Sequence, residues 1–143
     1  MKYYLGIDNG GTVTKAALYT KEGKLVALEQ ELTEVDSPQA GFIERDMERM
    51  KQANFKAVKF LIEKNNIDPS MIAGIACCGH GKGLYLVDSY GKPCREGILS
   101  SDNRAWEYPV KWEKEGTAEK VYEKTFQAVM ACQPVALLAW LKD

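Results

Sequence analysis

One stretch near the start of the chain decides its fold: Gly6-Ile7-Asp8-Asn9-Gly10-Gly11-Thr12-Val13-Thr14-Lys15. It places an acid at the end of a predicted strand, two glycines in a turn, and a threonine at the start of the next strand. Gly10 and Gly11 allow the backbone to approach a ligand closely and to turn its N–H groups toward phosphate oxygens. The pattern therefore predicts a hairpin that binds phosphate.

The polar side chains of this hairpin have predicted roles as well. Thr12 and Thr14 supply hydroxyl donors, and Asp8 is placed to hold Mg²⁺ through water, since this ion favours few carboxylates and several waters. The alternative is an ordinary Asx-Gly hairpin with a surface acid, which is the usual meaning of an isolated Asn-Gly pair. Asp8 favours the phosphate interpretation because it lies between the apolar Ile7 and the turn, where a structural residue need not be acidic.

The flanking sequence extends the hairpin into a small sheet. Three short strands are predicted, over Tyr3 to Asp8, Thr12 to Tyr19 and Lys24 to Glu31. The breaks between them, at residues 9–11 and 21–23, have the turn chemistry that joins antiparallel neighbours. The domain is therefore expected to open with a three-stranded β-meander.

Helices and further strands are predicted to alternate after the meander. Apolar residues recur at helical spacing from Met47 to Ile62, Asp46 is placed to cap the first turn, and Asp68-Pro69 disfavours continuation beyond Asn65. The later elements are a buried strand over Ile72 to Cys78, a strand over Leu84 to Asp88, and helices over Arg104 to Glu115, Thr117 to Thr125 and from Pro134 onward. This order indicates an α/β fold, and because the last helix meets no stop signal we expect the chain to be part of a longer protein.

A glycine-flanked bend, Gly79-His80-Gly81-Lys82-Gly83, separates the two later strands. Small residues open space beside a sheet edge, and the His80 imidazole can both donate to and accept from a ligand hydroxyl. The alternative is that His80 is a satisfied core or surface residue. A Walker A loop ending at Gly81-Lys82 is excluded, because Ala76 stands where its first glycine is needed and Gly83 where Ser or Thr is needed.

The segment from Ile98 to Arg104 carries a second polar pair, Asp102 and Arg104. Asp102 is placed to cap the helix that follows it. Ligand contact by Asp102 and Arg104 is the alternative, and both interpretations stay open at this point.

Composition restricts the class of partner. The 143 residues include 45% hydrophobic and 27% charged residues, and the formal net charge of −1 gives no broad attraction to nucleic acid or to an anionic membrane. No apolar stretch suits a signal peptide or a membrane span, so we expect a cytoplasmic protein with small-molecule chemistry. The four cysteines lack paired CxxC spacing and are expected to be reduced thiols, and no structural metal site is expected.

The hairpin resembles the first phosphate motif of the actin-like ATPases, a superfamily that includes sugar kinases and the Hsp70 chaperones. The bend around His80 and Lys82 resembles the sugar-contacting bend of the FGGY carbohydrate kinases. Asp102 and Arg104 match that family's segment of apolar residues, Trp, variable, Asp, variable, Arg, although Ser100 replaces the tryptophan. Within the family the chain looks closest to L-xylulose kinases, on the stretches 81–84 and 98–102.

The resemblance implies an incomplete ribonuclease-H-like, actin-like ATPase domain, with residues 1–143 as the N-terminal portion of the first, sugar-binding domain. It implies ATP-dependent phosphorylation of a sugar, such as the ketopentose L-xylulose, with Mg²⁺ as metal. The implied phosphate contacts are Asp8, Gly10, Gly11, Thr12 and Thr14, and the implied sugar contacts are His80, Lys82, Asp102 and Arg104. The general base and the second nucleotide-binding domain lie outside this chain, which is then inactive alone. Homo-oligomerisation is left open. The alternatives are a non-catalytic actin-like binding module and an Hsp70-like fragment, which should lack the His80 and Asp102 motifs.

Overall fold

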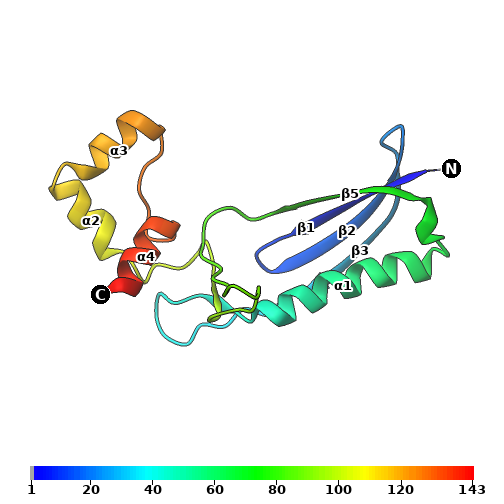
Figure 1. Ribbon diagram of the computed structural model, residues 1–143, viewed down its shortest axis with the longest axis horizontal. Coiled ribbons are helices and arrows are strands. Elements are labelled where there is room, and N and C mark those ends of the chain that lie inside the picture. The colour runs from blue at the N-terminus through cyan, green and yellow to red at the C-terminus, as the bar shows by residue number, and fades with distance from the viewer. Residues whose placement is uncertain (1) are drawn as a thin grey trace. The chain divides into compact units, whose positions relative to one another are not determined.

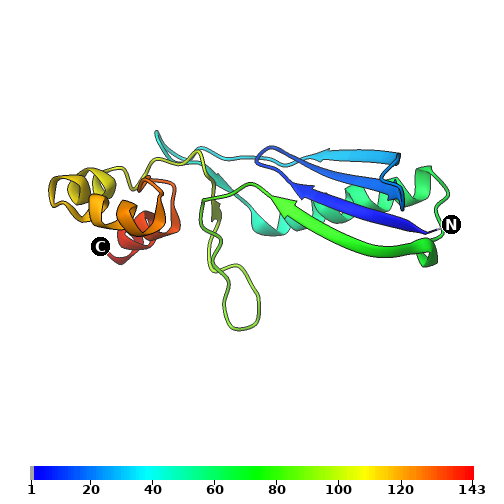
Figure 2. The same cartoon turned by 90° about the horizontal axis from the view of Figure 1, so that it is seen from above.

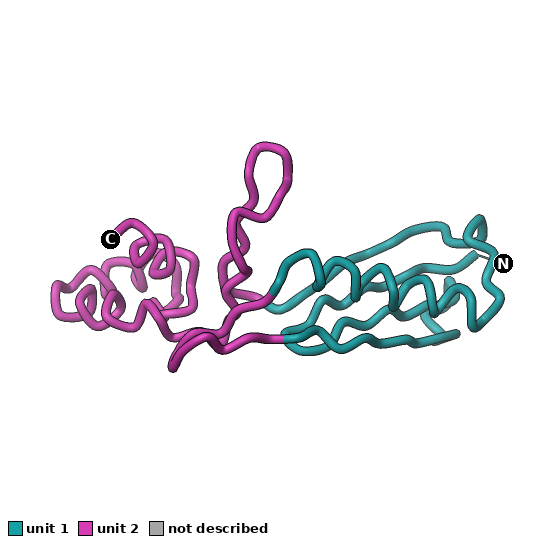
Figure 3. The backbone as a smooth tube through the Cα atoms, turned by 90° about the horizontal axis from the view of Figure 1, so that it is seen from below, with its two compact units in different colours: residues 1–34, 46–80 teal, residues 35–45, 81–143 magenta. Residues whose placement is uncertain are grey.

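The computed structural model describes residues 2–143, which form two compact units, each built from two stretches of the chain (Figure 3). Unit 1 contains the residues up to Glu34 together with Asp46–His80. Unit 2 contains Val35–Arg45 together with Gly81–Asp143. The predicted phosphate hairpin and His80 therefore belong to unit 1, and the other predicted sugar contacts belong to unit 2.

Unit 1 is a four-stranded sheet with one long helix along one face (Figure 1). The strand order is β3-β2-β1-β5; the first three strands pair antiparallel, and β5 pairs parallel to β1 after a crossover through the helix. The predicted β-meander is confirmed. The elements are β1 (Tyr3–Asn9), β2 (Val13–Thr20), β3 (Leu25–Leu32), α1 (Met47–Lys64), a 3₁₀ turn (Pro69–Met71) and β5 (Ile72–Gly79).

Helix α1 begins and ends where its sequence signals predict. The Asp46 carboxylate accepts hydrogen bonds from the backbone N–H groups of Glu48 and Arg49, at 2.7 and 2.9 Å. These bonds satisfy donors of the first turn that have no partner within the helix. At the other end, Asn65 forms the C-cap.

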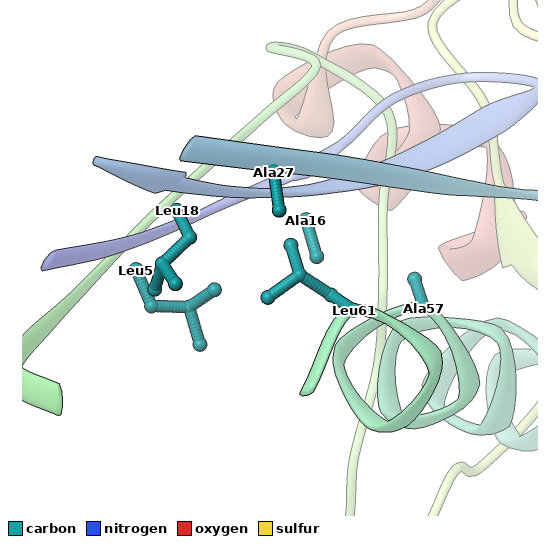
Figure 4. Close-up of a cluster of buried hydrophobic side chains, with 6 residues drawn as sticks. All are labelled: Leu5, Ala16, Leu18, Ala27, Ala57 and Leu61. Atoms are coloured by element: carbon teal, nitrogen blue, oxygen red, sulfur yellow. The ribbon is translucent and has the colours of Figure 1, made fainter. Parts of the chain in front are cut away.

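The core of unit 1 forms because strand residues alternate between the two faces of the sheet. Every second residue of the meander points at α1, where small and branched side chains interlock (Figure 4). Leu18 from β2 and Leu61 from α1 are both 0% exposed. The buried cluster consists of Leu5, Ala16, Leu18, Ala27, Ala57 and Leu61.

The prediction that β5 is a buried strand is wrong in this structure. Ile75 is 64% exposed, and Cys77 and Cys78 are exposed as well. The reason is geometric: β5 lies at the edge of the sheet, whereas α1 packs mainly on β2 and β3. An apolar run alone does not show whether the neighbouring layer extends far enough to cover it.

Unit 2 combines a two-stranded ribbon with three short helices. The ribbon pairs β4 (Glu44–Arg45) with β6 (Gly97–Ile98) in antiparallel register. The helices are α2 (Glu107–Lys114), α3 (Thr117–Thr125) and α4 (Pro134–Lys142). They confirm the three predicted helical segments, although α2 begins three residues later than expected. The buried cluster of this unit consists of Leu84, Ile98, Ala105, Ala136 and Leu137.

The strand predicted over Leu84 to Asp88 does not form. Only isolated bridges occur there, because the chain folds back on itself: the Asp88 carboxylate accepts from the N–H groups of Tyr90 and Lys92. The segment is seen in Figure 2 as a narrow projecting loop. Polar turn chemistry at Asp88 thus overrides the β propensity of the residues before it.

The two glycines of the β1–β2 turn meet different surroundings. A Cβ added to Gly10 would lie 2.5 Å from the carbonyl oxygen of Val13, closer than side-chain carbons are found to approach. A Cβ added to Gly11 would meet nothing within 4 Å. Close backbone packing therefore requires glycine at position 10 only.

The core packing predicts a large effect of truncating Leu61. The Leu61→Ala variant should lower the free energy of unfolding by about 2–5 kcal/mol, because the side chain is fully buried between α1 and the sheet. The matched control is Leu32→Ala on the 81% exposed Leu32, which should change it by about 0.5 kcal/mol or less. Urea denaturation followed by circular dichroism measures both. Equal losses in the two variants would contradict the assigned core.

The turn geometry predicts unequal effects of two alanine substitutions. Gly10→Ala should lower the free energy of unfolding by about 1–3 kcal/mol, since the new methyl group forces the Val13 carbonyl to move. Gly11→Ala should stay within about 0.5 kcal/mol of the parent chain. The same denaturation measurement compares the pair, and a Gly11 variant as unstable as the Gly10 variant would show that the turn is packed differently.

Candidate functional site

The β1–β2 hairpin of unit 1 carries the predicted phosphate contacts. Asp8 and Lys15 are cross-strand partners, as are Asn9 and Thr14, and the turn lies between them. Alternation along β1 places Asp8 on the face of the sheet opposite α1, beside a hollow of about 330 Å³ that its side chain helps to line. A carboxylate therefore lies at the rim of open space, directly before backbone amides that can face an anion.

Asp8 also has a neighbour on β5. The Cys78 thiol donates to Oδ1 of Asp8 over 3.6 Å, and the two residues are register partners in the parallel pair. Partial desolvation, followed by the charge and hydrogen bond of Asp8, raises the pKa of the Cys78 thiol. The thiol consequently stays protonated at neutral pH and acts as a donor to the carboxylate, not as a competing anion.

The Thr14 side chain is buried, and its hydroxyl contacts other protein groups. Its side chain is 0% exposed, and its hydroxyl oxygen lies 2.5 Å from Oδ1 of Asn54 and 3.2 Å from the carbonyl oxygen of Asp8. A buried hydroxyl that is engaged in this way has no donor left for a phosphate. We therefore exclude Thr14 from the phosphate contacts that we propose below, whereas Thr12 is exposed on the turn.

His80 follows β5 and adjoins the hairpin within unit 1. Its backbone N–H donates to the carbonyl oxygen of Asn9 at 3.3 Å, and its ring Nδ1 lies 3.3 Å from the same oxygen. The structure thus groups His80 with Asp8 and the turn. The roles assigned to these residues from the sequence stay predictions.

Asp102 and Arg104 form a buried ion pair in unit 2. Both side chains are 0% exposed; Nη2 of Arg104 lies 2.8 Å from Oδ2 of Asp102, and Nη1 lies 2.7 Å from Oε1 of Glu44. The guanidinium also lies 4.0 Å from the ring centre of Phe42 and 5.2 Å from that of Trp140. Burial lowers the pKa of Arg104, but its bonds to Asp102 and Glu44 outweigh this effect and raise the pKa, so the group stays charged.

This cluster joins the segment that follows β6 to the residues at β4, and so links the two sides of the ribbon. Oδ2 of Asp102 accepts from the backbone N–H of Ile43 at 2.6 Å, and its Oδ1 accepts from that of Arg104. In the described structure these groups are occupied by protein partners. The predicted helix cap at Asp102 is wrong, because α2 begins at Glu107 after Trp106 and no side chain caps it. Sugar contact by Asp102 or Arg104 stays a prediction that this geometry does not support.

Lys82, in contrast, is exposed. It adopts a left-handed conformation with φ of 66°, next to Gly83, where a Cβ would lie 2.4 Å from the carbonyl oxygen of Ile98. Its Nζ lies 2.9 Å from the sulfur of Met130, a weak acceptor, and the side chain lines a hollow of about 430 Å³ in unit 2. A backbone in this region is costly for a residue with a side chain, and such strain is often found at functional sites.

The residues also fit the metal that the resemblance implies. Among residues 2–143 no three His, Cys, Asp or Glu side chains form a metal cluster. A single half-buried carboxylate at a hollow, Asp8, is compatible with Mg²⁺, which keeps several waters and needs only one or two carboxylates.

None of the helices among residues 2–143 has the length and apolar character of a membrane span.

Sequence reasoning missed Asn54, which contacts both strands of the hairpin from α1. A signal was present in the sequence. Met50, Asn54, Ala57 and Leu61 recur at the spacing of one helix face, and Asn54 is the polar member of this otherwise apolar stripe. A polar residue on a predicted buried face usually has a buried partner.

Known sugar kinases are similar to this chain in sequence. The chain is 43% identical over its whole length to a probable L-xylulose kinase of Pasteurella multocida, and 39% identical over 99% of its length to the L-xylulose/3-keto-L-gulonate kinase of Escherichia coli. It spans 30% and 28% of the lengths of these two relatives. The chain therefore aligns with less than one third of each.

Solved structures confirm the predicted fold class. A ligand-bound xylulose kinase from Lactobacillus acidophilus superposes with a TM-score of 0.87 at 29% identity, covering 100% of this chain and 29% of that one. A xylulose kinase from Rhodospirillum rubrum gives a TM-score of 0.89 at 24% identity, covering 99% of this chain and 29% of that one. Residues 3–143 match the model of the N-terminal domain of the FGGY family of carbohydrate kinases, and the chain belongs to this family.

Proposed function

We propose that this chain is the first part of an ATP-dependent kinase that phosphorylates a sugar hydroxyl. The observation that carries the proposal is the β1–β2 hairpin, in which Asp8 stands at an open hollow directly before the glycine turn. Family membership over residues 3–143 supports the same activity. The proposed partner is a small-molecule sugar, and the proposed location is the cytoplasm.

The hairpin residues have separate proposed roles in binding ATP phosphates and the metal ion. The turn of Gly10, Gly11 and Thr12 supplies N–H and hydroxyl donors for ATP phosphates, and Asp8 holds Mg²⁺ through bound water. When bound, this ion neutralises charge that develops on the transferred phosphoryl group. The proteins that this chain resembles are more than three times as long. We therefore place the general base in the remainder of the first domain and most of the adenosine site in a second domain, both outside these 143 residues. The 143 residues alone are then inactive.

We propose sugar contacts for His80 in unit 1 and, separately, for Lys82 in unit 2. His80 adjoins the hairpin, and its imidazole can exchange hydrogen bonds with a hydroxyl. Lys82 is exposed and offers a cation with no carboxylate partner among residues 2–143. L-xylulose is our first candidate substrate, because L-xylulose kinases are among the most similar relatives. Neither a non-catalytic module nor an Hsp70-like fragment is favoured, since the phosphate motif and the His80 and Asp102 motifs are all present.

In the intact kinase, Asp8→Asn should lower kcat by about 10²–10³-fold and leave the KM for the sugar nearly unchanged. The reason is that the lost charge acts on metal and phosphate, not on the sugar. Steady-state kinetics with a coupled ADP assay measures both constants. The matched control is Asp36→Asn, an exposed aspartate in unit 2, which should keep wild-type values. A normal kcat with a raised sugar KM would place Asp8 at the sugar instead.

A substrate screen tests the sugar. Among ketopentoses, aldopentoses, ketohexoses and polyols, the intact kinase should prefer L-xylulose, because a site built to bond particular hydroxyls rejects analogues that leave its groups unpaired. His80→Ala should lower kcat/KM for the sugar by an amount equivalent to about 0.5–1.5 kcal/mol of activation free energy. It should affect the KM for ATP less. A clear preference for glycerol or a hexose would overturn the ketopentose assignment without affecting the kinase assignment.

A further inference from the structure

The side-chain amide of Asn54 lies beneath the phosphate hairpin and contacts both of its strands. Its Oδ1 lies 2.5 Å from the Thr14 hydroxyl on β2. Its Nδ2 donates to Oδ1 of Asn9 on β1, at 3.2 Å, and to the carbonyl oxygen of Met50 one turn earlier in α1, at 2.9 Å. One side chain of the helix thus joins the two strand ends to each other and to α1.

The two strand residues held in this way flank the turn. Asn9 is the last residue of β1, Thr14 is the second of β2, and they are cross-strand partners. Only residues 10–13 lie between them, and these include the proposed phosphate contacts. The position of the turn over α1 is therefore set at the point where the amide binds.

Packing alone does not require an amide at this place. Asn54 belongs to the helix stripe that continues into Ala57 and Leu61, where the contacts with the sheet are apolar. Burying an amide costs free energy unless its groups are paired, and here the oxygen and both hydrogens of Asn54 have partners. The full set of bonds fixes a single orientation of the amide, and hence of the strand ends that it binds.

The contacts continue from Asn9 to the proposed sugar side. Nδ2 of Asn9 donates to the sulfur of Met50 at 3.3 Å, so its amide is held from α1 at both ends. The carbonyl oxygen of Asn9 accepts from the backbone N–H of His80. Asn9, to which Asn54 donates, is thus the chain neighbour of Asp8 and the hydrogen-bond partner of His80.

We propose that Asn54 is a positioning residue of the phosphate hairpin. It touches no ligand; it holds Asn9 and Thr14 so that the turn amides and the Asp8 carboxylate are already placed when ATP binds. The proposal rests on the proposed kinase function. Preorganised groups need no rearrangement during the reaction, and small displacements of such groups are costly in rate.

The test uses the intact kinase and compares four variants. Asn54→Leu removes the amide at similar volume, and Thr14→Val removes only the hydroxyl that meets it. Each should lower kcat/KM for ATP by about 10- to 100-fold and change the KM for the sugar by no more than about twofold. Thr14→Ser, which keeps the hydroxyl, should restore most of the ATP kinetics. Because the two residues act as a unit, the double variant of Asn54→Leu and Thr14→Val should be hardly worse than the worse single one.

The matched control is Asn65→Leu. Asn65 lies at the end of the same helix, and its Nδ2 also donates to the carbonyl oxygen four residues earlier, at 2.9 Å, but it makes no contact with the hairpin. This variant should lower the melting temperature while keeping wild-type ATP kinetics. Kinetics are measured well below each melting temperature, so that a loss of stability is not counted as a loss of rate. If Asn54→Leu does not fold, Thr14→Val and Thr14→Ser decide the question.

The outcomes separate this inference from the function on which it rests. Wild-type ATP kinetics in folded Asn54→Leu and in Thr14→Val, with a strong defect in Asp8→Asn, would overturn the role of Asn54 and leave the kinase assignment intact. A serine variant as impaired as the valine variant would also overturn it. Full activity in Asp8→Asn would instead contradict the proposed function of the hairpin itself.

Discussion

The packing of α1 against the meander is the constraint on which the rest of unit 1 depends. Leu18 and Leu61 meet in the fully buried layer between them, and this layer fixes which face of each strand points at the helix. Because strand residues alternate, burying Leu5 and Leu18 places Asp8 on the opposite, open face. The hydrophobic core thus sets the face of the sheet on which the carboxylate of the candidate site lies.

Polar contacts then fix the positions of chain segments that hydrophobic packing alone does not determine. In unit 1, the amide of Asn54 ties the two strand ends to the helix, next to the turn. In unit 2, Arg104 has a comparable role, since its guanidinium joins Asp102 and Glu44 and lies against aromatic rings. The amide of Asn54 is half-buried and the guanidinium of Arg104 is buried, and each bonds several protein partners. Such networks stabilise one arrangement over similar alternatives.

Local signals made most of the fold predictable. Turn glycines, strand alternation, the Asp46 cap and helical periodicity identified the meander, α1 and the three later helices. One error occurred where a distant part of the chain decides the outcome: burial of β5 depends on how far α1 reaches across the sheet, which the local residue pattern does not contain. The other error has a local cause, since the Asp88 carboxylate binds the N–H groups of Tyr90 and Lys92 and turns the chain where a strand was predicted.

The sequence by itself determined the family, the hairpin and the candidacy of Asp8, because adjacent residues in a turn carry that information locally. Only the tertiary structure decided which partners Thr14, Asn54, Asp102 and Arg104 contact. Thr14 was expected at the phosphate but is buried against Asn54, which comes from 40 residues away. Asp102 and Arg104 were expected at the sugar but bind Ile43 and Glu44. The role of a polar side chain depends on the group that it bonds, and packing between segments distant in sequence decides which group that is.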